Sequence, residues 1–520
     1  PRLAGLGHLS AADVEALSAG YRFLRDAEHS LQAEGDQQTQ SLPAQGLSRL
    51  RLARSLGFVD FDAFEAVLDG HRGRIEAVFA GLIGETELPD SEGLQLWLHP
   101  DDRTRLEACG FEDVEAAAGH LQTLITARDR SDVSGQARER LDKLMPRLLD
   151  QVGALDRPGL ALARVVPVLK AVMRRSAYLA LLDENPAALA HFLNLAVRSR
   201  WLAEELARHP AFFDALLEAG HLAALPDRDT LAAELREQIA LAERQGQERV
   251  LDALREYKEH HVFNVALAEV RGTLPLMNAS DYLTFLAEAV LDEALDLAWR
   301  ENAERFRDVA PADRRPFIIV GYGKLGGIEL GPGSDLDLVF IHDLPADAGQ
   351  FLHRLVRRLL HTITVPTYLG SLYEVDMRLR PSGRSGTMVS SLESFRDYQL
   401  NEAWVWEHQA LVRARGVAGD RNLIERFQDV RREVLCLSRD RDGLKAEVLN
   451  MRRRMAEHHQ DETGLKRGAG GIVDIEFMVQ YLVLAHAHEH PELAVYSDNM
   501  RILETAERLE LLTPAVAGDL

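Results

Sequence analysis

The stretch that decides the fold is FIIVGYGKLGGIELGPGSDLDLVFI, residues 317–341. Its first four residues, 317–320, are apolar and mostly β-branched, and a glycine ends the run, a pattern typical of a buried strand. Residues 335–342 alternate, so that Asp335 and Asp337 share one face of a second predicted strand and apolar side chains share the other. The sequence therefore predicts two strands joined by a glycine-rich turn, with two carboxylates on one side.

The turn, GYGKLG at residues 321–326, satisfies the G-x-G-x-x-G pattern of dinucleotide-binding folds. In those folds the turn opens a crossover helix of about ten or more residues, whereas Gly331-Pro332-Gly333 ends this segment almost at once. We therefore reject a Rossmann fold. We expect instead a turn whose backbone N–H groups approach phosphate oxygens, because glycine puts no Cβ in the way.

A third carboxylate comes from residues 373–380, YEVDMRLR, which alternate strictly between apolar and charged side chains. As a strand, this segment places Asp376, Arg378 and Arg380 on one face. Carboxylates on adjacent strands repel one another unless cations neutralise them, and Mg²⁺ or Mn²⁺ bound by oxygen atoms does so. Such a cluster holds two ions about 4 Å apart for phosphoryl or nucleotidyl transfer, while Lys324 and the two arginines balance the remaining charge.

Composition and charge exclude several classes of protein. The 60 Lys and Arg against 82 Asp and Glu give a net charge of −22, which opposes a long nucleic-acid track or an anionic-membrane surface. The two cysteines, Cys109 and Cys436, offer no disulfide framework and no cysteine-built zinc site. No apolar run is long enough to span a bilayer. We expect a cytoplasmic protein with no nucleic-acid or membrane partner, and, from Pro1 and Leu520, a piece of a longer chain.

The glycine turn, the Ser-Asp-x-Asp string at residues 334–337 and the later aspartate resemble the DNA polymerase β-like nucleotidyltransferase superfamily. This resemblance implies a small five-stranded mixed sheet. Gly323-Lys324 stands where the superfamily usually has Gly-Ser or Gly-Gly, so that Ser334 or the Lys324 ammonium is expected to make the phosphate contact.

Four longer strings resemble the glutamine synthetase adenylyltransferase family: residues 321–340, 373–395, 403–415 and 466–480. Full chains of that family carry two nucleotidyltransferase halves, of which the first removes AMP from glutamine synthetase by phosphorolysis and the second attaches it. The resemblance implies that this chain holds the second half. That half transfers AMP from ATP to a tyrosine hydroxyl of glutamine synthetase and releases pyrophosphate, with glutamine and the PII signal protein as effectors, in the control of nitrogen assimilation.

The resemblance also assigns site residues and cofactors. Asp335, Asp337 and Asp376 are the expected catalytic and metal-binding residues, with two Mg²⁺ ions, or Mn²⁺, and with ATP as substrate. Asp376 is expected to assist deprotonation of the tyrosine hydroxyl, because that group ionises only near pH 10. The expected nucleotide-binding residues are Gly323, Lys324, Gly326, Gly327, Gly333, Ser334, Arg378 and Arg380.

The expected architecture is α+β and predominantly helical, with helical bundles flanking the small nucleotidyltransferase domain. The expected regions are a helical tail of the preceding catalytic half at 1–50, a helical linker region at 51–150, a regulatory or partner-binding helical bundle at 151–310, the catalytic domain at 311–430, and a truncated C-terminal helical segment at 431–520.

One further motif and two other function classes stay open. The loop at residues 466–471, KRGAGG, combines two cations with glycines and suits contact with a phosphate, a regulator or the preceding domain, or a plain link between helices. Glu476, on the helix that follows, is a candidate for the same cleft. The alternative functions are a related nucleotidyltransferase that acts on nucleic acid or a small molecule, and a non-catalytic scaffold that senses ATP.

Overall fold

The computed structural model describes residues 11–35, 42–43, 46–82, 91–213, 225–311, 315–457 and 464–512. The chain divides into two compact units, one formed by Pro1–Ile125 with Arg138–Gly159 and the other by Thr126–Ala137 with Leu160–Leu520. Within the described ranges, no helix is both long and apolar enough to cross a bilayer. The five regions expected from the sequence stay predictions.

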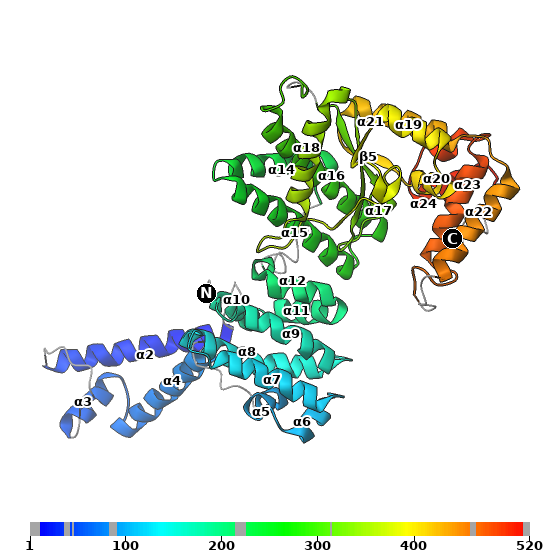
Figure 1. Ribbon diagram of the computed structural model, residues 1–520. Helices are drawn as coiled ribbons and strands as arrows, with labels where there is room; N and C mark the ends of the chain where they lie inside the picture. Colours follow the sequence, from blue (N-terminus) through cyan, green and yellow to red (C-terminus); the bar gives the residue numbers. More distant parts are fainter. Residues whose placement is uncertain are drawn as a thin grey trace. The chain divides into compact units, whose positions relative to one another are not determined.

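The first described helices, at the blue and cyan end of the colour scale in Figure 1, show how the sequence sets their starts. Ser91 and Asp102 each cap a helix by accepting a hydrogen bond from a backbone N–H in the first turn. The helices are α2 (Ala11–Gly35), α3 (Leu47–Ser55), α4 (Phe61–Leu82), α5 (Glu92–Leu98), α6 (Arg103–Ala108), α7 (Val114–Arg128) and α8 (Gly135–Gly153).

The helices before the sheet in the second unit include its two longest. These helices are α9 (Pro158–Val172), α10 (Ser176–Glu184), α11 (Pro186–Arg198), α12 (Arg200–Arg208), η1 (Pro210–Phe212), α14 (Arg228–Glu243), α15 (Gln247–Arg271) and α16 (Leu276–Ala303).

The remaining helices lie between the strands or follow them, again with aspartate caps at Asp420 and Asp498. They are α17 (Gly323–Gly326), η2 (Ala346–Ala348), α18 (Gly349–Thr364), η3 (Gly383–Ser385), α19 (Leu392–Asn401), α20 (Val405–Val412), α21 (Arg421–Leu435), α22 (Arg441–Glu457), α23 (Ile472–His486), η4 (Pro491–Ala494) and α24 (Asn499–Arg508).

The described residues form one mixed sheet of five strands, which confirms the predicted fold class. The strand β1 pairs antiparallel with β2 on one side and with β5 on the other, and β2 pairs parallel with both β3 and β4. An antiparallel β1–β2 pair is incompatible with a Rossmann unit, whose strands are parallel. The strands are β1 (Phe317–Tyr322), β2 (Leu336–His342), β3 (Val375–Asp376), β4 (Val389–Ser391) and β5 (Arg415–Gly419).

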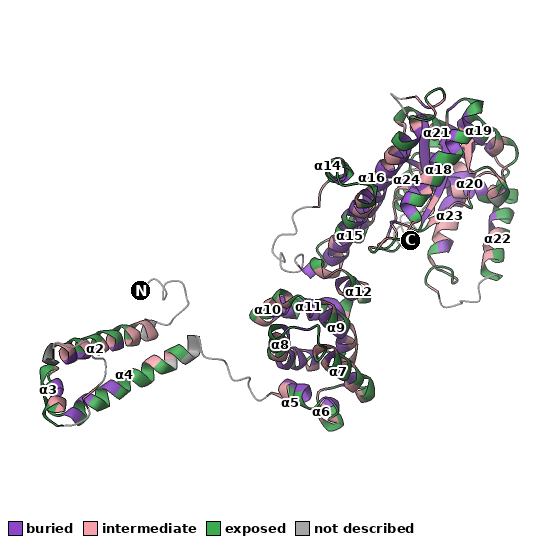
Figure 2. Ribbon diagram, turned by 60° about the vertical axis from the view of Figure 1, so that its left-hand side comes forward, coloured by how far each residue is buried: buried purple, intermediate pink, exposed green. Residues whose placement is uncertain are grey.

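Each face of the sheet packs on helices, and β1, β2 and β5 are largely buried whereas β3 and β4 are half-buried (Figure 2). The predicted alternation holds on β2: Leu336, Leu338 and Phe340 belong to a core shared with α14, α15, α16 and α18. Val339 and Ile341 point the other way, into a core shared with helices α19 to α24. Asp337 has the same parity as these two residues, so it lies on that second face at the end where β2 begins.

Candidate active site

Asp337 lies at the start of β2 between two other strands. Its register partner on β1 is Tyr322, and its partner on β3 is Asp376. Asp335 precedes β2 and is exposed, whereas Asp337 is half-buried. Burial, and then the negative charges of Asp335 and Asp376, raise the pKa of Asp337 to about 6. The three carboxylates predicted to be catalytic are therefore brought together at one edge of the sheet.

The glycine turn passes close to the Asp337 carboxylate. Gly323 has a φ of 54°, in the left-handed region, and a Cβ at this position would overlap Asp337 Oδ2. A Cβ at Gly326 would overlap the backbone carbonyl of Arg413, and one at Gly327 would meet the Arg413 guanidinium. Neighbouring groups of the chain therefore require glycine at these three predicted positions.

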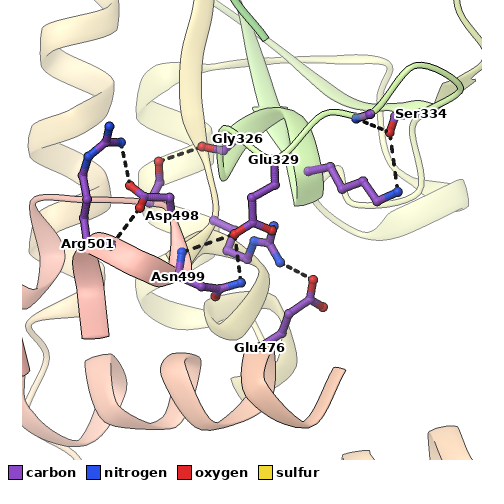
Figure 3. Close-up of polar contacts among 11 residues, drawn as sticks. Gly326, Glu329, Ser334, Glu476, Asp498, Asn499 and Arg501 are labelled. Carbon is purple, nitrogen blue, oxygen red and sulfur yellow. Dashed lines mark hydrogen bonds and ion pairs between the residues drawn. The ribbon is translucent and has the colours of Figure 1, made fainter. Parts of the chain in front are cut away.

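The other end of the turn carries a hydroxyl and an ammonium. The backbone N–H of Gly331 donates to Ser334 Oγ at 3.0 Å, and Lys324 Nζ donates to the same oxygen at 3.5 Å, as Figure 3 shows around the labelled Ser334. Gly333 is exposed, and a Cβ there would meet nothing within 4 Å. Packing therefore does not explain glycine at position 333. The Ser334 hydroxyl and the Lys324 ammonium lie together and suit contact with an anion.

Of the strand predicted over residues 373–380, only Val375–Asp376 is a strand, and the rest of the prediction is wrong. The side chain of Asp376 accepts a hydrogen bond from the backbone N–H of Arg378 at 2.9 Å, and this local bond turns the chain out of the sheet. Arg378 Nε donates to the same carboxylate at 2.7 Å, and this pairing raises the pKa of the Arg378 guanidinium. Arg380 folds back on the turn and donates to the carbonyl of Met377 at 3.1 Å.

The charge and donor chemistry of the three carboxylates fit a divalent cation. Carboxylate oxygens are the donors that Mg²⁺ and Mn²⁺ prefer, and a bound cation would offset the burial and the like charges of Asp335 and Asp376 that raise the pKa of Asp337. In the arrangement that the described residues adopt, no three Asp, Glu, His or Cys side chains surround one ion position, and Asp376 is paired with Arg378 instead.

A buried arginine ties the turn to the C-terminal helices, and the sequence analysis missed it. The side chain of Arg413 is 3% exposed and forms ion pairs with Glu329, just beyond the turn, and with Glu476 on α23. Asn499, at the start of α24, donates from Nδ2 to Glu329 Oε1 at 2.9 Å (Figure 3). The charge pattern alone gives no signal for this network, because 84 residues separate Arg413 from Glu329.

The backbone of the segment that follows the turn is strained, and the network stabilises this strained conformation. Ile328 has a φ of 55°, a left-handed conformation that costs a β-branched residue about 1–3 kcal/mol. On one side of Ile328, Ser497 Oγ donates to the carbonyl of Gly326 at 2.7 Å. On the other side, Glu329 is held by Arg413 and Asn499. The C-terminal helices thus fix both ends of this strained step.

Two family models match the chain. Residues 189–430 match the model described as glutamate-ammonia ligase adenylyltransferase. Residues 1–83 and 442–520 match the model described as GlnD PII-uridylyltransferase. The first match contains the whole glycine turn and all three aspartates, and the second contains the loop at 466–471 and the helices α23 and α24.

Curated relatives match nearly the whole chain. The bifunctional glutamine synthetase adenylyltransferase/adenylyl-removing enzymes of Pseudomonas syringae and Pseudomonas aeruginosa are 45% and 46% identical to it, over 98% of this chain and 56% of each relative. The enzyme of the same name from Thioalkalivibrio sulfidiphilus is 42% identical over 97% of this chain. The chain spans about half the length of the curated relatives it matches. The chain is thus similar to the glutamine synthetase adenylyltransferase family, and the matched region contains the three clustered carboxylates and the glycine turn.

Proposed function

We propose that the chain transfers AMP from ATP to a tyrosine hydroxyl of glutamine synthetase and releases pyrophosphate. The observation that carries the proposal is the strand register that pairs Asp337 with Asp376 and packs Gly323 against the Asp337 carboxylate. This combination of clustered carboxylates and a glycine turn suits nucleotidyl transfer. The names of the relatives support glutamine synthetase as the acceptor.

Two parts of the proposal rest on family resemblance rather than on the geometry. We propose that this chain is the adenylylating half of the bifunctional enzyme, because its motifs resemble that half. We also propose that the PII signal protein and glutamine act on it as effectors. A nucleic-acid acceptor is disfavoured by the net charge of −22, since a phosphate track needs many Lys and Arg side chains.

The proposed reaction is an in-line displacement at phosphorus. The tyrosine oxygen forms a bond to the α-phosphorus of ATP, the bond from that phosphorus to the α,β-bridging oxygen breaks, and its electron pair leaves with pyrophosphate. The tyrosine proton passes to the carboxylate of Asp376. Arg378, whose side chain is 70% exposed, would release Asp376 for this step and transfer its hydrogen bonds to the phosphates.

The other residues hold the nucleotide and the charge. Asp335, Asp337 and Asp376 would hold two Mg²⁺ ions, which supply charge neutralisation at the α-phosphate and at the leaving pyrophosphate. Ser334 and Lys324 would contact phosphate oxygens from the end of the turn. Gly323 keeps the turn close enough to Asp337 for both to face the same phosphate.

The experiment is transfer of label from α-³²P-ATP to unmodified glutamine synthetase in the presence of Mg²⁺. We expect label on the synthetase with α-³²P-ATP and none with γ-³²P-ATP, because only AMP is transferred. The double variant Asp335→Asn, Asp337→Asn should abolish labelling. Asp343→Asn is the matched control, because this exposed aspartate follows the far end of β2, where it pairs with Arg426.

Two outcomes would contradict the proposal. If wild-type protein binds Mg²⁺ and ATP but leaves glutamine synthetase unlabelled, the acceptor is wrong for this chain. If the double aspartate variant labels the synthetase as well as wild type does, the reaction does not use this carboxylate cluster.

A further inference from the structure

Arg415, the first residue of β5, contacts the glycine turn through both its backbone and its side chain. In the antiparallel register of β1 and β5 it is the partner of Gly321, where the turn begins. Its side-chain Nη2 donates to the carbonyl of Leu325, inside the turn, at 3.3 Å. Arg415 therefore contacts the start and the middle of the segment that carries Lys324 and packs on Asp337.

The carbonyl of Leu325 lies near the end of the short helix α17, where backbone hydrogen bonding is weak. The backbone N–H of Ile328 donates to it at 3.4 Å, which is long for a hydrogen bond. The last carbonyls of a helix lack partners within the helix, and arginine side chains near that end supply the missing donor. Arg415 fills this role for α17, directly before the strained conformation at Ile328.

A buried carboxylate holds the guanidinium of Arg415 in place. Glu288, on α16, is 3% exposed, and its Oε1 forms an ion pair with the same Nη2 atom of Arg415 that bonds to the turn. The other carboxylate oxygen, Oε2, lies 2.5 Å from Nη2 of Arg228 on α14. A buried charge that loses its partner is strongly destabilising, so Arg415 is kept at this position by more than its bond to the turn.

The neighbouring Arg413 ties the same turn to different helices. Arg413 pairs with Glu329, just beyond the turn, and with Glu476 on α23, which follows the sheet in the chain. Arg415 ties the turn to α16, which precedes the sheet and lies outside the range 311–430 predicted for the catalytic domain. The turn is thus supported by one arginine from each of two sets of helices.

We propose that Arg415 is a positioning residue for ATP, which holds the glycine turn in the conformation that receives the phosphates, and that Glu288 keeps Arg415 there. The charge of Arg415 is paired with Glu288 and its donor is bonded to the turn, so it acts through the turn. A residue of α16 therefore belongs to the framework of the nucleotide site. This inference rests on the proposed function for its nucleotide, and its test separates the two.

The test is calorimetric titration of the 520-residue chain with ATP in Mg²⁺, with thermal unfolding of each variant. Arg415→Met removes the hydrogen bond to the turn and should weaken ATP binding about tenfold. Arg415→Lys should restore most of the affinity, because the ammonium keeps both the charge and a donor. Arg228→Met is the matched control, since it removes the other partner of Glu288 and, among the described residues, Arg228 has no bond to the turn. It should change ATP affinity by less than about twofold.

A double variant separates positioning from the stability of the fold. Glu288→Gln, Arg415→Met removes both charges of the pair, so stability should recover relative to Arg415→Met, while ATP binding should stay about tenfold weaker than in wild type. Glu288→Gln alone keeps Arg415 without its anchor and should weaken ATP about threefold. In the transfer assay, KM for ATP should rise in Arg415→Met and KM for glutamine synthetase should not.

Four results overturn the inference: unchanged ATP affinity in Arg415→Met, unchanged ATP affinity in Glu288→Gln, an equal loss in Arg228→Met, or recovery of ATP affinity together with stability in the double variant. Failure of the proposed function looks different, because the titration contains no glutamine synthetase. Wild type would then bind ATP, and Arg415→Met would bind it less tightly, although the synthetase stays unlabelled.

Discussion

The chain contains two glycine-rich segments beside a lysine, the turn at 321–327 and the loop at 465–471, and they use glycine for different reasons. In the turn, a Cβ would collide with groups from elsewhere in the chain, the carboxylate of Asp337 and the backbone and side chain of Arg413. In the loop, Gly470 has a φ of 75° in open space, and a Cβ on Gly471 would meet only the carbonyls of its own loop. Glycine thus lets site groups approach the turn, whereas it lets the loop fold on itself.

The largest effect that this comparison predicts is at the carboxylate beneath the turn. Asp337→Asn should lower the rate of AMP transfer by about a thousandfold or more, because it removes a charge that the transition state needs. The variant should be at least as stable as wild type, since the ionised carboxylate is disfavoured where it lies. Label transfer measures the rate, and thermal unfolding measures the stability. A variant that loses activity because it no longer folds would contradict the account.

Gly323→Ala should have the next largest effect. The new Cβ would overlap Asp337 Oδ2 and impose a left-handed φ on alanine, so the turn and the carboxylate must move apart. A displacement of about 1 Å at a catalytic group costs about a hundredfold in rate, and we expect kcat/KM to fall by that amount. Gly349→Ala, at the start of α18 and outside the site, is the control, because a Cβ at this exposed position meets nothing within 4 Å. Equal activity in the two variants would show that the close approach of Gly323 to the Asp337 carboxylate is not required for catalysis.

The two segments also differ in the sign of their pH dependence. The pKa of Asp337 is raised to about 6, so its contribution to the free energy of unfolding, on the order of 3 kcal/mol, is present below about pH 4 and is lost as pH rises through about 6. In the loop, the hydrogen bond from Arg452 lowers the pKa of Asp474, so that contribution is present above about pH 4 and is lost as pH falls.

Denaturant unfolding between pH 3.5 and 7.5, in metal-free buffer, checks both signs. Asp337→Asn should gain stability over wild type as pH rises, and Asp474→Asn should lose stability over the same range. The same direction of change in both variants would show that the two carboxylates do not lie in the opposed environments described for them.

The smallest effect is expected in the loop. Gly470→Ala forces alanine into a left-handed conformation with no collision, which costs about 1–2 kcal/mol of stability. Arg452 on α22 and Asp474 on α23 hold the loop backbone, so the strain should not displace it. We therefore expect AMP transfer to fall by no more than about threefold. A loss as large as that of Gly323→Ala would remove the distinction between the two segments.

The sequence predicted the parts of the site that depend on local alternation. Residues 317–320 and 335–342 became β1 and β2, and the parity of Asp337 against Leu336 and Leu338 is as predicted. Alternation failed at Asp376, where a side chain bonds its own backbone two residues on and ends the strand. Such competition between a side chain and the sheet is not visible in a pattern of polar and apolar residues.

Long-range partners could not be predicted at all. Arg413 reads as one arginine near the end of a helix, and nothing in its neighbours indicates that it is buried between Glu329 and Glu476. The loop at 466–471 stands out in the sequence for its charges, but its hydrogen bonds with Arg452 and Asp474 depend on where α22 and α23 pack. Tertiary packing decided both, and only the structure shows it.

The most direct test of the central claim, that the carboxylates act as one unit, is the rate of AMP transfer to glutamine synthetase for Asp335→Asn, Asp337→Asn and the double variant. Groups that act together lose most of their effect when one is removed. The account predicts that each single variant loses most of the activity and that the double variant is within a few-fold of the worse single one. Losses that multiply, or a single variant near the wild-type rate, would contradict it.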